Sequence, residues 1–370
     1  MRPLLALLLL SAAVRAADPP AIRLNQIQVI GTHNSYHIAP CGEVKKLMAV
    51  AKKSWPDEAD YTHRPLAEQF GDLGVRQIEL DVFADPKGGL FAKPSAYRVL
   101  TDRKTDAGPN PNAGGVLDKP GFKVLHVQDV DYLTTVPTLD DALKQVRDWS
   151  KAHPKHVPIC VLLELKDESY PLLPTKPVKF DGKQLDAVDV AIRAVFDRAH
   201  LFAPDDLRGD AKDLPTAIRG RGWPTLDAVR GKVFFALDNG GGIRDEYLKG
   251  RENLKGRAMF ADAKDAKQPA AAWFKVNDPV KDFARIRKLV AAGFLVRTRA
   301  DESTRQAREN DTARRDKALA SGAQFVSTDF PEPRKEWSAY AVRFPGGVTV
   351  RANPVSGKGF TGEQEPKAKR

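Results

Sequence analysis

Polar side chains follow the first apolar stretch of the chain directly. Residues 25–30 alternate like a β-strand, with Ile27 and Val29 on one face, and His33 and Asn34 come soon after it. In α/β sheets and barrels, catalytic side chains lie at the carboxyl ends of the strands. A histidine at such a position can exchange a proton near neutral pH, and an asparagine oxygen can bind a metal ion. Taken alone, however, His33 is better explained as a buried, hydrogen-bonded histidine.

Carboxylates occur in two later apolar stretches, with a second histidine, His126, between them. Glu79 and Asp81 are two residues apart, so the alternation of a strand places both on the same face. Glu164 lies near the end of residues 158–165, which are otherwise apolar, and a carboxylate in such a strand is rarely buried unless it is paired or bound to a metal. The plainer explanations are an exposed edge strand for Glu79 and Asp81, and ordinary packing for His126.

In a barrel, these oxygen-bearing side chains would meet at one mouth. Carboxylate and amide oxygens suit calcium or magnesium and are poor ligands for zinc or copper. Three carboxylates that converged without a cation would repel one another and raise one another's pKa. Either a hard cation is bound by Asn34, Glu79, Asp81 and Glu164, or these carboxylates do not all converge.

Alternating strand-like and helix-like stretches favour a parallel sheet or barrel. Expected strands lie at 25–30, 75–83, 122–127, 158–165, 233–237, 294–296 and 325–326, with either 258–261 or 273–276 as one more. Helical spacing of apolar residues predicts helices that include 64–73, 138–149, 185–199, 283–290 and 303–320. The number of strands favours a (β/α) barrel of the α/β class over an open doubly wound sheet, and the lack of a glycine-rich phosphate loop after the first strand also counts against the open sheet. We expect a single domain over residues 18–353.

The two ends of the chain have distinct compositions. Residues 1–17 are typical of a secretory signal peptide, because Arg2 precedes an apolar core that ends in a small-residue cleavage pattern. That core is too short to span a bilayer, and no later segment is long and apolar enough to do so. We therefore expect a secreted or periplasmic protein. The polar residues 354–370 are expected to form a disordered tail.

The net charge indicates which binding partners are compatible with the sequence, and the two cysteines bear on a possible disulfide. The net charge of +11 suits anionic partners such as lipid headgroups, although a solvated basic surface without a partner would have the same charge. No RNA- or DNA-binding motif is present, so we expect no nucleic-acid partner, and we expect a monomer. A disulfide between Cys41 and Cys160 and a buried free thiol at Cys160 are about equally compatible with the sequence.

The motifs described above resemble those of the phosphatidylinositol-specific phospholipase C-like phosphodiesterases. The resemblance rests on Thr32-His33-Asn34-Ser35-Tyr36, Ile78-Glu79-Leu80-Asp81, Leu125-His126 and Leu163-Glu164, in that order. A narrower likeness to the calcium-dependent secreted bacterial branch includes residues 297–301 and 321–330. The resemblance implies a distorted TIM barrel with calcium held by Asn34, Glu79, Asp81 and Glu164. It also implies a phospholipid substrate at a membrane surface.

The chemistry implied by this resemblance is attack of the neighbouring inositol hydroxyl on phosphorus, which releases diacylglycerol and an inositol phosphate. His33 would stabilise charge on the phosphoryl oxygens, and His126 would do the same or protonate the leaving oxygen. Glu79 or Glu164 would be the general base. The candidates for contacts with phosphate or inositol are Lys166, Arg297 and Arg299, for which surface charge is an almost equal explanation. The remaining histidines are expected to be structural, with His37 as a weak reserve: His37, His63, His153, His156 and His200.

Two other functions remain open on the sequence alone. The same barrel would serve a glycerophosphodiester or sphingomyelin phosphodiesterase, because those relatives also use a histidine, a Glu-x-Asp step and a second histidine. The insertion-like segment between Asn34 and Glu79 and the loop at 102–121 would line the mouth, so they bear on the choice of substrate. A function of another class is non-catalytic binding of anionic headgroups. A carboxylate cluster beside two histidines argues against simple anion binding.

Overall fold

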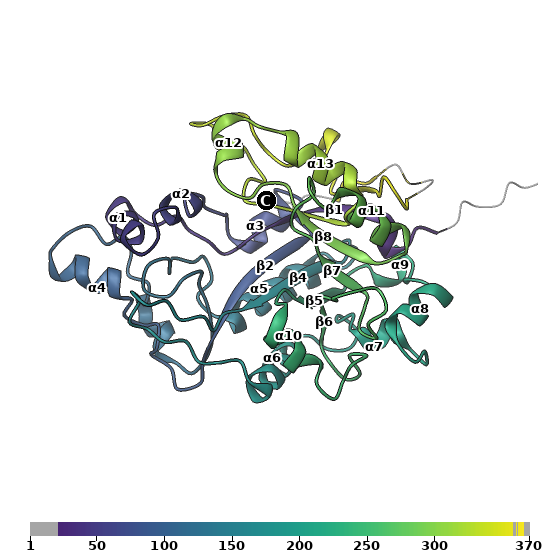
Figure 1. Ribbon diagram of the computed structural model, residues 1–370, viewed down its shortest axis with the longest axis horizontal. Helices are drawn as coiled ribbons and strands as arrows, with labels where there is room; N and C mark the ends of the chain where they lie inside the picture. Colours follow the sequence, from purple (N-terminus) through teal and green to yellow (C-terminus); the bar gives the residue numbers. More distant parts are fainter. Residues whose placement is uncertain (1–20, 358–359, 361, 366–370) are drawn as a thin grey trace, which may run out of the picture.

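A parallel barrel forms the centre of the protein in the computed structural model, which describes residues 21–357, 360 and 362–365 (Figure 1). In the described part of the chain, the parallel strands are hydrogen-bonded in the order β6-β5-β4-β2-β1-β9-β8-β7. They are β1 (Ile27–Thr32), β2 (Gln77–Asp85), β4 (Ile159–Leu165), β5 (Val233–Leu237), β6 (Met259–Ala261), β7 (Trp273–Lys275), β8 (Leu295–Arg299) and β9 (Phe325–Thr328). A single parallel bridge between Asp262 and Trp273 nearly closes the ring between β6 and β7. The predicted TIM-barrel fold is confirmed.

Two antiparallel strands are added to this ring. β3 (Gly121–Val124) pairs with the end of β2, and β10 (Val350–Ala352) pairs with β1. The prediction of a barrel strand at 122–127 is therefore wrong in direction and place. β2 continues beyond the barrel to Asp85, and β3 folds back to supply hydrogen bonds to that projecting end. The eighth barrel strand is found elsewhere, since both 258–261 and 273–276 contribute strands.

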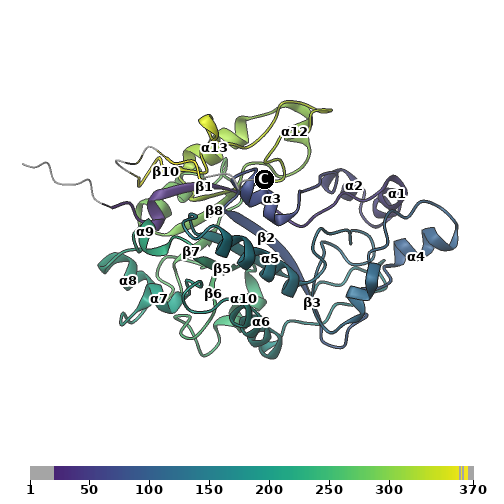
Figure 2. The ribbon, with the colours of Figure 1, turned by 180° about the vertical axis from the view of Figure 1, so that it is seen from behind.

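Helices cover the outside of the barrel (Figures 1 and 2). Thr138 caps the first turn of the helix over Leu139–Ala152 (α5), where the Thr138 hydroxyl accepts a hydrogen bond from the Asp141 backbone N–H. The predicted helix at 303–320 is interrupted, because Asn310 has a left-handed backbone (φ 53°) that ends one helix before the next begins. The helices are α1 (Gly42–Ala51), α2 (Trp55–Glu58), α3 (Leu66–Gly71), α4 (Ser95–Asp102), α5 (Leu139–Ala152), α6 (Gly182–Val195), α7 (Pro204–Arg208), α8 (Leu214–Gly220), α9 (Leu226–Val229), α10 (Gly241–Leu248), α11 (Phe283–Ala291), α12 (Arg305–Glu309) and α13 (Ala313–Ser321), with 3-10 turns at Leu24–Gln26, Ala113–Asp118 and Pro345–Gly347.

Insertions after β1, β2 and β4 build a lobe beside the mouth of the barrel, which we call the side lobe. It contains α1, α2 and α4, which project to the left in Figure 1 and to the right in Figure 2. The side lobe has its own hydrophobic cluster, which includes Met48, Leu100, Val130 and Leu173 and is separate from the large core around the strands. The insertions leave the carboxyl ends of the strands, so the side lobe forms a wall of the mouth.

Several predictions concern the ends of the chain and its cysteines. The predicted signal peptide, 1–17, lies outside the described residues, and the domain boundaries stay a prediction. Within the described part of the segment 354–370, Glu365 pairs with Arg76, and Glu363 lies 2.7 Å from Arg230. Cys41 and Cys160 are both free thiols, and Cys160 is buried in β4. No helix in the described residues is both long enough and apolar enough to cross a bilayer.

Candidate active site

Three carboxylates from neighbouring strands converge inside the mouth of the barrel. Glu79 and Asp81 lie on one face of β2, and Asp81 is the direct partner of Glu164 on β4. One oxygen from each of the three carboxylates lies within 4.8 Å of the others. Glu79 and Asp81 are buried, whereas Glu164 is partly exposed. The alternation of the strands thus places these side chains together, as the sequence predicts.

Burial makes the ionised form of this cluster costly. Burial raises the pKa of Glu79 to about 7, with Asp238 and Glu164 adding to the rise and Arg297 opposing it. The pKa of Asp81 is raised well above its usual value by burial and by the carboxylates of Glu164 and Glu79, although Lys166 opposes this rise. A cation among these oxygens would favour the ionised form of both groups.

The set of oxygens fits a hard cation. Both carboxylate oxygens of Asp81 and the side-chain oxygen of Asn34 are buried and have no hydrogen-bond partner in the part of the chain that the structure describes. Lys166 Nζ lies 3.3 Å from Asp81 Oδ2 and 3.4 Å from Glu164 Oε1, which are ion-pair distances. Buried oxygens without donors are what a calcium or magnesium ion would satisfy. We therefore regard Asn34, Glu79, Asp81 and Glu164 as a candidate cation site.

The backbone holds Asn34 beside Glu79. The residue after it, Ser35, donates its N–H to the Glu79 carbonyl (2.9 Å), and the Ser35 hydroxyl accepts a hydrogen bond from the Glu79 N–H (2.8 Å). Asn34 itself has a left-handed backbone (φ 41°). Its side-chain NH₂ donates to the hydroxyl of Tyr61 (3.0 Å), which leaves the amide oxygen as the free end.

His33 is held by two charged partners. Its Nδ1 lies 2.8 Å from Asp329 Oδ1, and its Nε2 lies 3.2 Å from Arg299 Nη1. Because the guanidinium can only donate, His33 must accept at Nε2 and carry its proton on Nδ1. Burial, together with Arg299, lowers the pKa of His33 to about 3, so the ring is neutral near pH 7. His33 Nε2 also lies 3.7 Å from Glu79 Oε1, which connects this group to the carboxylates.

The predicted basic residues are all paired with carboxylates of the site. Lys166 lies between Asp81 and Glu164, as described above, and Arg299 Nη2 donates to Asp329 Oδ2 (2.8 Å). Arg297 is buried, pairs with Glu79, and donates to Asn277 Oδ1 (2.6 Å). The alternative of free surface charge therefore does not describe Arg297.

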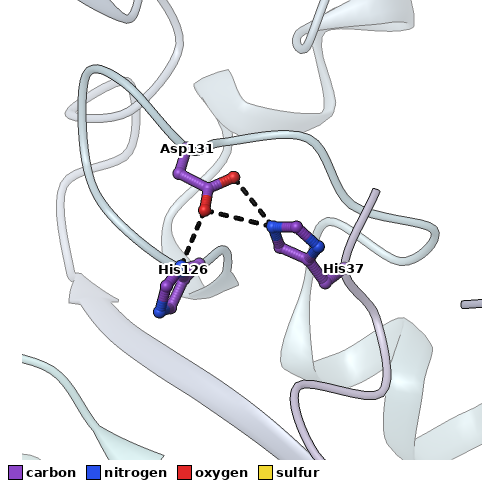
Figure 3. A group of neighbouring side chains, drawn as sticks. All are labelled: His37, His126 and Asp131. Carbon is purple, nitrogen blue, oxygen red and sulfur yellow. Dashed lines mark hydrogen bonds and ion pairs between the residues drawn. The ribbon is translucent and has the colours of Figure 1, made fainter. Parts of the chain in front are cut away.

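His126 belongs to a different group from the one formed by His33 and the carboxylates. It follows the antiparallel β3, and its Nδ1 lies 2.7 Å from Asp131 Oδ2. The same carboxylate contacts His37 Nε2, so Asp131 lies between two histidines (Figure 3). The His126 side chain is 29% exposed, whereas the side chains of His37 and Asp131 are fully buried.

Several residues at the mouth were not found by sequence reasoning. Asp329 directly follows β9, so its place at a strand end was a usable signal. Asp238 follows β5 in the same way, and it lies 2.6 Å from Lys275 of β7. No comparable signal marks Tyr61 or Asp131, which lie in irregular segments of the side-lobe insertions.

The fold and the site together define an α/β-barrel enzyme with acidic, basic and histidine side chains at the carboxyl ends of its strands. A family model described as calcium-dependent phosphoinositide phospholipase C matches residues 22–354. The chain therefore belongs to the family of calcium-dependent phosphoinositide phospholipases C, and the protein is a phosphodiesterase. No curated protein is significantly similar to it in sequence.

Solved structures with the same fold include enzymes of two bacteria. A calcium-dependent phosphatidylinositol-specific phospholipase C from Streptomyces antibioticus is 17% identical, with a TM-score of 0.52 over 84% of this chain and 96% of that one. The apo form of a calcium-dependent phosphoinositol-specific phospholipase C from a Pseudomonas species is 17% identical, with a TM-score of 0.53 over 90% of this chain and 97% of that one. Its myoinositol complex is 16% identical, with a TM-score of 0.52 over 90% and 96%. At these identities the likeness shows the shared fold.

Proposed function

We propose that the protein is a calcium-dependent phosphodiesterase that cleaves phosphatidylinositol or a related inositol phospholipid. In this proposal it is exported, acts as a monomer at a membrane surface, and has no nucleic-acid partner. The observation that carries the proposal is the cluster of Glu79, Asp81 and Glu164 beside the His33–Asp329 pair, together with the buried side-chain oxygens of Asn34 and Asp81 that accept no hydrogen bond within the described residues. Membership of the family supports it.

Asn34, Glu79, Asp81 and Glu164 are the proposed calcium ligands, because oxygens of the three carboxylates converge and the buried side-chain oxygen of Asn34 accepts no hydrogen bond within the described residues. When bound there, calcium would supply positive charge that lowers the pKa of the attacking hydroxyl and neutralises the phosphoryl oxygens. The pairing of β2 with β4 holds the three carboxylates in place. The two strands pair along six consecutive residues of β2, from Gln77 to Val82.

The other side chains of the mouth bind the phosphate and move protons. His33 and Arg299 face each other, and both would contact the phosphoryl oxygens. His126 would donate the proton to the leaving glycerol oxygen, because its ring is partly exposed. Glu79 is better placed than Glu164 to accept the proton of the attacking hydroxyl, because it lies beside His33.

Arg297 and Lys166 have different positions in this scheme. Arg297 is buried and paired with Glu79, so its role in this proposal is to orient the Glu79 carboxylate. Lys166 is partly exposed between Asp81 and Glu164, and we assign to it a contact with the phosphate or the inositol.

The test is cleavage of phosphatidylinositol vesicles, with calcium and with a chelator. We expect activity that is lost on chelation and restored by calcium, with release of a cyclic inositol phosphate. Activity that is indifferent to the chelator would contradict the calcium assignment, and preferential release of glycerol phosphate would indicate a glycerophosphodiesterase. Vesicle binding without turnover, unchanged in His33→Ala, would indicate a non-catalytic binding protein.

A further inference from the structure

Asp131 connects a fully buried histidine to a partly exposed one (Figure 3). His37 Nε2 lies 2.9 Å and 3.1 Å from the two oxygens of Asp131, and His126 Nδ1 lies 2.7 Å from Oδ2. His37 comes from the segment after β1, and the other two residues come from the segment after β3. This group lies outside the carboxylate cluster described above.

The partners of His37 define its protons. His37 Nδ1 lies 3.0 Å from the backbone carbonyl oxygen of Tyr61, which can only accept a hydrogen bond. Nε2 faces a carboxylate, which also accepts. Both ring nitrogens must therefore donate, and His37 is a buried imidazolium paired with an ionised Asp131. The pKa directions agree: burial would lower the pKa of His37, but the adjacent Asp131 raises it above its ordinary value, and the two histidines lower the pKa of Asp131 despite its burial.

This fixed charge determines the tautomer of His126. Because Asp131 is ionised, the facing Nδ1 of His126 carries a proton, and Nε2 is the ring nitrogen left free. In Figure 3 the second nitrogen of His126 is directed away from Asp131. The group thus presents one defined nitrogen on a partly exposed side chain.

The surrounding backbone makes the arrangement rigid. Val127 and Asp131 exchange two backbone hydrogen bonds of 2.9 Å, which close a tight turn between His126 and Asp131. Val127 packs into the hydrophobic cluster of the side lobe. On the other side, the ring of Tyr61 stacks on His37 with the ring centroids 4.4 Å apart.

Two nitrogens and a carboxylate also form a ligand set that suits zinc. Here, however, each facing pair of atoms is at hydrogen-bond distance, and the partners account for every proton. No fourth histidine, cysteine or carboxylate joins the group within the described residues. The hydrogen-bonded arrangement is therefore the one that the geometry supports.

We propose that His37 and Asp131 are positioning residues that hold His126 with Nδ1 protonated and Nε2 free to donate to the leaving oxygen. The inference rests on the proposed function, in which His126 is the general acid. As the new P–O bond to the inositol hydroxyl forms, the hydroxyl proton passes to Glu79. The P–O bond to glycerol breaks, and the proton on His126 Nε2 passes to the departing oxygen. His126 is then neutral and still donates from Nδ1 to Asp131.

The test compares two leaving groups. Phosphatidylinositol releases an alkoxide, which needs a proton, whereas a p-nitrophenyl ester of inositol phosphate releases a phenolate that leaves without one. For Asp131→Asn and His37→Gln we expect kcat on phosphatidylinositol to fall roughly tenfold to a hundredfold, but kcat on the nitrophenyl ester to fall by less than about threefold. The matched control is His156→Gln, another buried histidine, which we expect to lower neither rate. Equal losses on both substrates in the test variants would overturn the proposal.

A third variant separates this inference from the proposed function. His126→Ala should show the same dependence on the leaving group, with a larger loss. If His126→Ala lacks that dependence, the general-acid assignment itself fails. If His126→Ala shows it and the two positioning variants do not, the assignment stands and the present inference fails.

A measurement on the unmodified protein does not depend on whether a variant folds. Nitrogen NMR of histidine-labelled protein should show both His37 nitrogens protonated at neutral pH. It should also show the Nδ1–H tautomer for neutral His126. A neutral His37, or an Nε2–H tautomer of His126, would overturn the proposal.

Discussion

The carboxylate of Asp329 joins the two side chains that we expect to contact the phosphate. One of its oxygens accepts the proton of His33 Nδ1, and the other accepts from Arg299. Behind it, Asp301 Oδ1 accepts the Asp329 backbone N–H (2.9 Å), which fixes the position of the residue. A single carboxylate thus sets both the tautomer of the histidine and the direction of the guanidinium.

Replacing this carboxylate tests its role. We expect Asp329→Asn to lower kcat by roughly a hundredfold or more, because His33 loses the negative charge that holds its Nδ1–H in place. The measurement is phosphatidylinositol cleavage at saturating calcium, with circular dichroism to verify folding. Glu332→Gln, which removes a carboxylate paired with Arg64, is the control and should retain activity. An Asp329→Asn variant with ordinary kcat would contradict this assignment.

Tyr61 has a comparable relation to the proposed calcium site. Its hydroxyl accepts a hydrogen bond from the Asn34 NH₂ group and so directs the amide oxygen away from the phenol. We expect Tyr61→Phe to weaken calcium binding by roughly tenfold to a hundredfold, because the amide is then free to rotate. Titration calorimetry of the calcium-free protein measures this directly. Tyr132→Phe, whose hydroxyl faces the Ala107 carbonyl in the side lobe, is the control, and equal affinities in the two variants would contradict the prediction.

Among the strands, β1 and β2 show how closely the barrel is packed behind the site. A Cβ atom added at Gly31 would lie 2.1 Å from the side-chain oxygen of Gln77, which is buried. Glycine at this position therefore permits the close approach of the strand that leads to His33 and Asn34.

The substitution Gly31→Ala should accordingly be destabilising. We expect a loss of about 1–3 kcal/mol in the free energy of unfolding, because the Gln77 side chain must shift within a packed interior. Urea unfolding measures the loss. The control is Gly242→Ala in α10, where nothing lies within 4 Å of the added atom, and alanine there should be neutral or stabilising. Equal stabilities of the two variants would show that the strands have room to spare.

Sequence reasoning succeeded where the signal is local to one strand. The apolar run of β4 and the two-residue step from Glu79 to Asp81 need only strand alternation, and the structure brings Glu164 beside them. Whether a strand pairs in the parallel or the antiparallel direction depends on a partner that is distant in the sequence. Residues 122–124 have the composition of a strand, but pairing with the projecting end of β2 makes β3 antiparallel. No periodicity in the sequence encodes that choice.

Contacts between loops that are distant in the sequence could not be predicted either. His37 and Asp131 are separated by 94 residues, and each alone has an ordinary composition for a loop. Their contact depends on the side lobe, whose hydrophobic cluster joins insertions after three different strands. The sequence thus indicated the catalytic candidates on the strands, whereas the residues that orient them became visible only in the folded chain.

Considered as a whole, the molecule combines a positive net charge with a group of buried carboxylates at the mouth of the barrel. The chain carries a net charge of +11, yet the mouth contains buried carboxylates whose pKa values are raised by burial. A cation is therefore favoured locally in a protein whose overall charge suits anionic surfaces. This combination is what the proposed function requires, in which calcium binds among the carboxylates and an anionic lipid binds at the mouth.

Buried histidines give this positively charged protein a pH-dependent stability. Burial lowers the pKa of His156 to about 4. In the folded protein its Nδ1 donates to the Val157 carbonyl (2.6 Å), and its Nε2 lies 2.7 Å from the Ser150 hydroxyl. Between pH 6.5 and pH 4 the unfolded chain binds a proton at this residue and the folded chain does not. Its contribution to stability is therefore complete above pH 6.5 and is lost as the pH falls, by on the order of 3 kcal/mol.

Other buried groups act in the opposite direction, so the comparison must isolate His156. Burial raises the pKa of Asp262 and Asp301 to about 6, which favours the folded state as the pH falls toward 4. We expect denaturant unfolding from pH 7.5 to 4.5 to show a shallower loss of stability in His156→Gln than in the unmodified protein, because glutamine does not titrate. The control is His200→Gln, at a partly exposed histidine in the segment after α6, and its curve should run parallel to that of the unmodified protein. Parallel curves for the unmodified protein and His156→Gln would mean that His156 takes up its proton in the folded state, contrary to the partners that surround it.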